Sequence, residues 1–439
     1  MAMLGLAGCA TYAPKSLETD PAVLSAPVAA VLTRDAAAVK RLYLAPTTID
    51  LSRPLDPNAI ATLAVIANPD LKAQRQRAGV SDAQLFAARL LPDPTFSIGA
   101  NKVLAGPDRL LDVASALGLD ISALRTRGVR LAQARAQLGQ VRLDLAWAEW
   151  QVAGKARVQV ARIQVLERTL ALATASRDAT QSLLDRNLRA AGRGDISADQ
   201  VQAARVGAFD SAERLRTAQR DLTAARFELT RLIGLPPSWP LVLAPVVVPP
   251  APPSADTLFV IARDNRTDLQ ALRAGYEAQE AAVHKAVLDQ FPNLGLALNA
   301  NRDSAGNGML GPAISITLPL WNRNRGGIAI ERATRDALKA EFDARLFQTR
   351  AEIAAAVGGI AVARRQRDAV LRDLPALQKF AAANRRAASR GDLSLATAET
   401  AEQALRDKQA LLAQAEQDLI EQTIALELLT GTPMEDWPK

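Results

Sequence analysis

The stretch NLGLALNAN, residues Asn293–Asn301, alternates between leucine and small or polar residues. Successive side chains of a β-strand point to opposite faces, so the leucines share one face and the asparagines at 299 and 301 share the other. The stretch therefore predicts a strand that is apolar on one side and polar on the other.

Three more stretches carry the same alternation. They are residues 313–320 in the same half of the chain, and residues 95–101 and 113–122 in the first half. With seven to ten residues, they come close to the roughly 9–11 with which a tilted strand crosses an outer membrane. Their polar positions are candidates for the lining of a water-filled lumen: Ser97, Asn101, Asn299, Asn301, Ser315 and Thr317.

These four strands have two interpretations. They could be ordinary hairpins that pack leucines onto a soluble core, which agrees with an aromatic content of only 4%. Alternatively they face lipid, and then several chains must contribute, because four strands cannot close a barrel and open strand edges do not occur in hydrocarbon. We favour the second interpretation. The predicted fold class is mainly α with a small β part, in which a trimer shares a twelve-stranded barrel.

The chain contains one internal repeat. GRGDIS at residues 192–197 matches SRGDLS at 389–394, and leucines at 215, 222 and 229 recur in the same heptad phase at 412, 419 and 426. Such heptads are typical of helices that pack along their length. The repeats are predicted at 57–234 and 255–431, joined by a proline-rich linker at 235–254. Residues 10–56 are expected to be an extended N-terminal segment and 432–439 a C-terminal tail.

Long helices fill the rest of each repeat. The pattern predicts helices at residues 57–91, 125–190, 197–233, 255–291, 324–389 and 394–430. A helix of about 65 residues is about 95 Å long, which no compact domain accommodates. The helices are therefore expected to form antiparallel coiled coils in a rod or in the wall of a tube.

Composition excludes several functions. The net charge of +7 is modest for 439 residues, and the arginines are interleaved with acids, which favours a solvated helix face over nucleic-acid binding. The chain has one cysteine and one histidine, so it offers neither clustered metal ligands nor a catalytic Cys–His or Ser–His pair. We expect no enzyme, no metal site and no cofactor.

The single cysteine, Cys9, follows Leu6-Ala7-Gly8. This tetrapeptide resembles the lipobox of bacterial lipoproteins, in which lipid is attached to the cysteine and cleavage makes it the N-terminus. Residues 1–9 are therefore interpreted as the remnant of a lipoprotein signal, with covalent lipid on Cys9. The alternative is an incidental cysteine without a modification.

Together these features resemble the TolC-like outer membrane factor family over residues 58–431. The most specific match is LPLWNRNRGGIAIERA at residues 318–333, where strand passes into helix. It is similar to the P-L-F-N-R-N-x-G junction of the lipoprotein branch attached to heavy-metal efflux pumps, and glycines here are expected to allow the bend. The junction residues are Pro319, Trp321, Asn322, Arg323, Asn324, Gly326 and Gly327.

The resemblance also implies an assembly. Members of the family are homotrimers in the outer membrane of Gram-negative bacteria, and their barrel continues into a tunnel of periplasmic helices. Periplasmic adaptor proteins dock at the helical turns furthest from the membrane and connect the tunnel to an inner-membrane transporter, of the RND type in this branch. The matching turn positions are Gly192, Arg193, Gly194, Asp195, Ser197, Arg390, Gly391, Asp392 and Ser394.

One feature departs from the family. Some relatives carry gating aspartates six and nine residues after the second turn glycine, where this chain has Thr397 and Thr400, with Glu399 and Glu402 nearby. The leading hypothesis is a passive outer-membrane exit duct of a tripartite efflux system, with heavy-metal cations as the substrate implied by the junction. The alternatives are a multidrug or type I secretion duct, and a coiled-coil lipoprotein of the periplasm without a pore.

Overall fold

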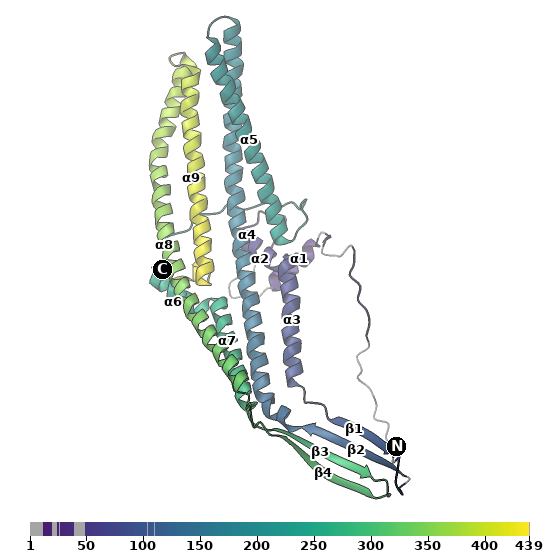
Figure 1. Ribbon diagram of the computed structural model, residues 1–439. Coiled ribbons are helices and arrows are strands. Elements are labelled where there is room, and N and C mark those ends of the chain that lie inside the picture. Colours follow the sequence, from purple (N-terminus) through teal and green to yellow (C-terminus); the bar gives the residue numbers. More distant parts are fainter. Residues whose placement is uncertain are drawn as a thin grey trace.

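Figure 1 shows an elongated molecule with a β-sheet at one end and two helical turns at the other. The computed structural model describes residues 12–19, 24–25, 27–38, 49–102, 104–108 and 110–438. Cys9 lies outside these residues. Long helices run between the two ends, so the expectation of a mainly helical rod with a small sheet is confirmed.

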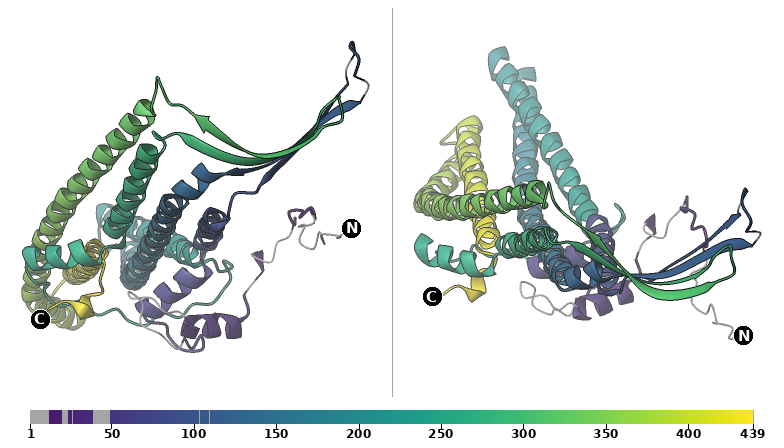
Figure 2. Two further views of the ribbon diagram at one scale, coloured as in Figure 1. Left: turned by 90° about the horizontal axis from the view of Figure 1, so that it is seen from below. Right: turned by 60° about the horizontal axis from the view of Figure 1, so that its bottom comes forward.

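The sheet has four antiparallel strands in the order in which they occur in the chain. They are β1 (Thr95–Lys102), β2 (Leu111–Asp120), β3 (Asn293–Arg302) and β4 (Gly308–Thr317). The β2 strand pairs with β3, so the sheet joins the two repeats. Figure 2 shows the four strands as one curved ribbon that extends beyond the helices.

Two predicted strand ends were wrong. The β4 strand ends at Thr317, so the leucines at 318 and 320 lie beyond it, because Pro319 has no amide hydrogen for the ladder. The β2 strand ends at Asp120, whose carboxylate accepts a hydrogen bond from the Ala123 amide at 3.2 Å. This cap starts the next helix at Ile121, four residues earlier than predicted.

Four long helices form two antiparallel pairs. In the first repeat α4 (Ile121–Gly192) packs on α5 (Ala198–Ile233), and in the second α8 (Arg325–Arg390) packs on α9 (Leu395–Thr430). The heptad leucines of α5 and α9 are buried at 222, 229, 419 and 426 and half-buried at 215 and 412. The predicted coiled-coil packing is thereby confirmed.

Each predicted helix before the strands is in fact two helices. They are α2 (Pro57–Ala67) with α3 (Pro69–Arg89), and α6 (Ala255–Asn265) with α7 (Thr267–Leu288). In the first repeat, Pro69 disfavours a helical Asn68, and the Asn68 side chain caps α3 by accepting from the Leu71 amide at 2.9 Å. The second repeat breaks at Arg266 without a proline.

The N-terminal segment was expected to be extended, but it contains the helix α1 (Ala29–Ala38). Leu32 and Ala36 of this helix are buried in a core that includes α2, α4 and α5. Next to it, the linker pairs with the chain ahead of α2, because the Leu55 amide donates to the Val242 carbonyl at 2.8 Å and the Ala244 amide donates to the Leu55 carbonyl at 2.8 Å. The helix α1 and the linker thus lie against the helical wall.

Each repeat contains an equivalent contact between helices that the sequence did not predict. The Asn68 side chain donates to the Leu232 carbonyl at 2.7 Å, and the Arg266 side chain donates to the Leu429 carbonyl at 3.3 Å. In each repeat this bond ties the break between the early helices to the end of the last helix. Glycine at 234 or 431, with φ of 83° or 73°, ends that helix.

We expect Gly234→Ala to lower the stability of the folded chain by at least about 2 kcal/mol. An added Cβ would lie 2.7 Å from the Ala67 carbonyl oxygen, and the left-handed φ of 83° disfavours any L-side chain. The matched control is Gly207→Ala inside α5, where nothing lies within 4 Å, and which should stabilise by up to about 1 kcal/mol. Thermal unfolding followed by circular dichroism measures both, and equal melting temperatures for the two variants would contradict the prediction.

Candidate functional site

The sheet has an apolar face that the chain leaves uncovered. The register sets Phe96, Leu117, Leu298 and Pro312 side by side across all four strands. Their neighbours on this face include Ile98, Leu296, Ile314 and Ile316, and each of these large side chains is exposed. An apolar surface that spans a whole sheet calls for an apolar environment outside the chain.

The opposite face of the sheet carries the predicted polar positions. Ser97 and Asn299 lie in one cross-strand row, and Ser315 pairs with Gly295 in another. By the same alternation, Asn101, Asn301 and Thr317 lie on this face as well. All six positions therefore share the face opposite the leucines, and their role in a lumen stays a prediction.

A cavity of about 640 Å³ lies where the polar face meets the helices. Charged side chains gather around it: Asp93, Asp120, Arg130, Lys285 and Asp289. The Ser122 hydroxyl joins strand to helix here, because it accepts a hydrogen bond from the Leu294 amide at 2.7 Å. The polar face thus continues from the sheet into the helical wall.

The predicted bend at the glycines of the junction was wrong. Arg323 and Asn324 make the turn from β4 into α8, with φ of 46° and 51°. The Asn324 side chain donates to the Ala286 carbonyl at 2.8 Å, which fixes the turn on α7. Gly327 is needed for a different reason, since a Cβ there would lie 2.4 Å from the Asn324 side-chain oxygen. Gly326 meets nothing within 4 Å.

The two helical turns at the far end have the same structure. Gly194 and Gly391 adopt φ of 79° and 84°. The amide of the aspartate that follows each glycine donates 3.0 Å back to a helix carbonyl, at Ala190 and Ala387. This is the pattern with which glycine ends a helix.

Side chains also repeat between these two turns. Arg193 pairs with Asp195, and Arg390 pairs with Asp392, both at 2.8 Å. The hydroxyl of Ser394 caps α9 by accepting from the Thr397 amide at 3.1 Å. Gly192 ends α4, and Ser197 is the cap residue of α5. Both turns are exposed at the end of the molecule opposite the sheet (Figure 1).

The acids near the second turn are paired with arginines. Glu399 forms an ion pair with Arg406, and Glu402 forms one with Arg385. Thr400 donates its hydroxyl to the Ala396 carbonyl within its own helix. Both of these carboxylates are thus neutralised by arginines of the same chain.

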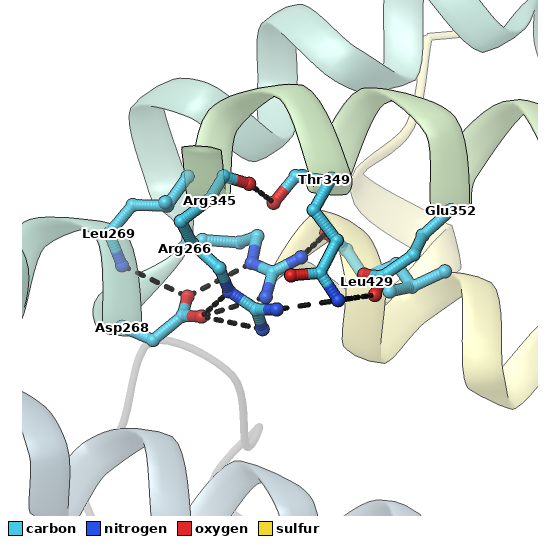
Figure 3. A network of polar contacts seen from close by, with 8 residues as sticks. Arg266, Asp268, Leu269, Arg345, Thr349, Glu352 and Leu429 are labelled. Carbon is cyan, nitrogen blue, oxygen red and sulfur yellow. Dashed lines mark hydrogen bonds and ion pairs between the residues drawn. The ribbon is translucent and has the colours of Figure 1, made fainter. Parts of the chain in front are cut away.

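A buried polar network joins α6, α7, α8 and α9 (Figure 3). Arg266 has no exposed surface, and its two nitrogens Nε and Nη2 bind the Asp268 carboxylate at 2.9 and 2.7 Å. Arg345 of α8 reaches the same carboxylate at 3.2 Å. The guanidinium of Arg266 also lies over the ring of Trp147 at 4.9 Å from its centre. The sequence did not predict this network, because Arg266 is a single arginine inside a predicted helix and nothing in its surroundings marks it.

Another buried ion pair joins the two repeats through α4 and α9. Arg157 pairs with Glu427, whose side chain is 2% exposed. Burial raises the pKa of the Glu427 carboxyl above its ordinary value, although Arg157 opposes the shift. Among the described residues, no group of three or more histidine, cysteine, aspartate or glutamate side chains is placed to hold a metal ion.

Comparison with protein families gives a match over residues 258–432, which fit the family described as "Outer membrane efflux protein". The second repeat is thus similar in sequence to the outer membrane efflux protein family. This family consists of channels, not enzymes, as the composition predicted. A sequence comparison with curated proteins found no match.

Solved structures of outer membrane proteins share the fold of the whole chain. CusC matches with a TM-score of 0.71 and 17% identity over 90% of this chain and 97% of CusC. The outer-membrane channel OprN matches with a TM-score of 0.72 and 17% identity over 97% and 99% of the two chains. VceC from Vibrio cholerae matches with a TM-score of 0.69 and 17% identity over 86% and 96%. The first repeat and the sheet therefore share the fold of these three proteins too.

Proposed function

We propose that the protein is the outer-membrane channel of a tripartite efflux system and conducts substrate passively away from the cell. The observation that carries this proposal is the sheet, with a continuous apolar face outside and a polar face that leads into the helical wall. A strand of this kind spans an outer membrane with its apolar face in lipid and its polar face in water.

The channel requires further copies of the chain. The β1 and β4 strands each pair on one side only, and unpaired strand edges do not occur in hydrocarbon. The helical wall also has two free edges, with α8 on one side and α3 and α5 on the other. Head-to-tail contact between these edges would close a ring. We propose a homotrimer with twelve strands.

The free edges of the wall carry exposed apolar side chains. Phe347 of α8 is 78% exposed, and Phe86 of α3 and Phe209 of α5 are exposed as well. On α8, exposed alanines stand at heptad spacing on both sides of Phe347: Ala333, Ala340, Ala354 and Ala361. This helix also contains the one stretch of the described chain that is long and apolar enough to cross a membrane, of which 22% is buried. A neighbouring helix of another copy would cover this surface.

The exposed helical turns suggest the partner proteins of the channel. The exposed turns at Gly194 and Gly391 would receive a periplasmic adaptor protein, and the adaptor would connect the channel to an inner-membrane transporter of the RND type. Resemblance of the junction at residues 318–333 supports heavy-metal cations as the substrate. Sensitivity of a deletion strain to copper, zinc and cadmium salts, compared with its sensitivity to dyes and antibiotics, tests this substrate class.

Two adjacent positions of β3 test the channel itself. Leu298→Arg places a charge on the apolar face, which should cost about 2–4 kcal/mol per chain in the membrane and prevent assembly. Asn299→Arg is the matched control on the opposite face and should assemble. In planar bilayers we expect wild type to conduct, N299R to conduct with a shift toward anion selectivity, and L298R to give no channels. Equal conductance of L298R and wild type would contradict the proposal.

Lipid attachment at Cys9 is a separate proposal, supported by the sequence Leu6-Ala7-Gly8-Cys9. We expect Cys9→Ala to abolish the incorporation of labelled fatty acid, because no other residue of the chain carries a thiol. Channels should still form, since the barrel supplies its own membrane contact. Label retained on the variant would contradict lipidation of this residue.

A further inference from the structure

Four points of the chain meet at the end of the sheet that joins the helices. Thr95 at the start of β1 pairs with Gly118 near the end of β2, and Asn293 at the start of β3 pairs with Thr317 at the end of β4. Residues just outside these strand ends therefore lie at one level. If the sheet spans a membrane, this level is the membrane surface next to the helices.

Charges of both signs lie together on the polar side of this level. The aspartates at 93, 120 and 289 line the cavity there with Arg130 and Lys285. The segment from Leu318 to Arg325 contributes nothing to that cavity, and it begins with exposed leucines at 318 and 320. Trp321 is 89% exposed and comes directly after these leucines. The segment thus adds exposed apolar side chains next to the end of β4 and does not line the cavity.

Two arginines of this segment have uncompensated charge. Arg323 and Arg325 are exposed, and neither side chain makes an ion pair or a hydrogen bond with any residue that the structure describes. Asn324 between them is fixed on α7, so the backbone that carries both arginines is held in place. Arg323 keeps a φ of 46°, a conformation that costs a non-glycine residue free energy.

We propose that Trp321, Arg323 and Arg325 bind phosphate headgroups of phospholipids at the membrane surface next to the helices. This inference rests on the proposed function as an outer-membrane channel. Tryptophan prefers the boundary between hydrocarbon and water, and a guanidinium donates two parallel hydrogen bonds to a phosphate. Both unpaired arginines follow the exposed leucines and Trp321, at the level where these headgroups would be, and neither lines the cavity that holds the aspartates.

The test compares lipid retention by full-length trimers. Wild type, R323Q/R325Q and the control R186Q/R189Q are purified in detergent, and native mass spectrometry titrates phosphatidylglycerol and phosphatidylethanolamine onto each. The control arginines are exposed on α4 near the helical turns and make no ion pair among the described residues. We expect binding to weaken about fivefold for each junction arginine and to stay unchanged in the control.

A second variant separates lipid binding from folding. Arg323→Gly suits the positive φ at this position, so the trimer should be at least as stable as wild type while it binds phospholipid about fivefold more weakly. Wild-type retention in R323G and in R323Q/R325Q would overturn the inference, as would an equal loss in R186Q/R189Q. A wild-type chain without conductance in vesicles of the same lipids would overturn the proposed function and this inference with it.

Discussion

Arg266→Ala is expected to lower the stability of the folded chain by about 3 kcal/mol, because it leaves the largely buried Asp268 carboxylate without its main partner. The Arg266 side chain has no exposed surface and holds Asp268 through two hydrogen bonds (Figure 3). The same guanidinium binds the Leu429 carbonyl and lies over Trp147. The substitution therefore disconnects the end of α9 from the start of α7, and thermal unfolding by circular dichroism measures the loss.

The effect of R266A should depend on pH. Burial raises the pKa of Asp268, but the hydrogen bonds and charges of Arg266 and Arg345 together hold it below its ordinary value. A lowered pKa in the folded state stabilises the chain above the ordinary carboxyl pKa of about 4, and this contribution is lost as the pH falls through the folded pKa. The difference between wild type and R266A should therefore shrink in acid.

Arg263→Ala is the matched control for R266A. Arg263 lies three residues before Arg266 and pairs with the adjacent Asp264 at 2.9 Å, but both side chains are about half exposed. An exposed pair of this kind contributes at most about 1 kcal/mol. If R263A and R266A unfold at the same temperature, the buried network does not stabilise the contact between Arg266 and the end of α9.

A double substitution at the helical turns, Gly194→Leu with Gly391→Leu, is expected to abolish export and leave the amount of trimer unchanged. Both glycines have positive φ, so leucine distorts each turn. Nothing lies within 4 Å of either position, so the distortion should stay within the turns and leave the buried heptad leucines in place. Cross-linking to the adaptor in cells and a substrate-resistance assay measure the result.

Gly207→Ala, inside α5 and outside the predicted docking positions, is the control. This glycine also meets nothing within 4 Å, but its φ is not positive, so alanine fits without strain. We expect normal export and cross-linking from G207A. A double leucine variant that exports like wild type would show that the turns only end the helices. Loss of its trimer from the membrane would contradict the expectation that the distortion stays local.

The sequence by itself determined the helices, the strands and their faces. Heptad leucines such as Leu222 and Leu419 are buried as their spacing required, and the alternation in β3 placed Leu298 and Asn299 on opposite faces. These features could be predicted because the periodicity of a helix or a strand depends only on neighbouring residues, not on distant parts of the chain. The glycine turns were equally local, since the residue itself permits the positive φ.

Only the tertiary structure decided where the chain breaks and bends. The break at Arg266 depends on the Leu429 carbonyl, 163 residues away, and on a carboxylate that Arg345 shares from α8. The bend into α8 falls on Arg323 and Asn324 because Asn324 reaches the Ala286 carbonyl, 38 residues earlier, while the neighbouring glycines stay helical. No local pattern records such contacts, because their free energy exists only when distant segments have already come together.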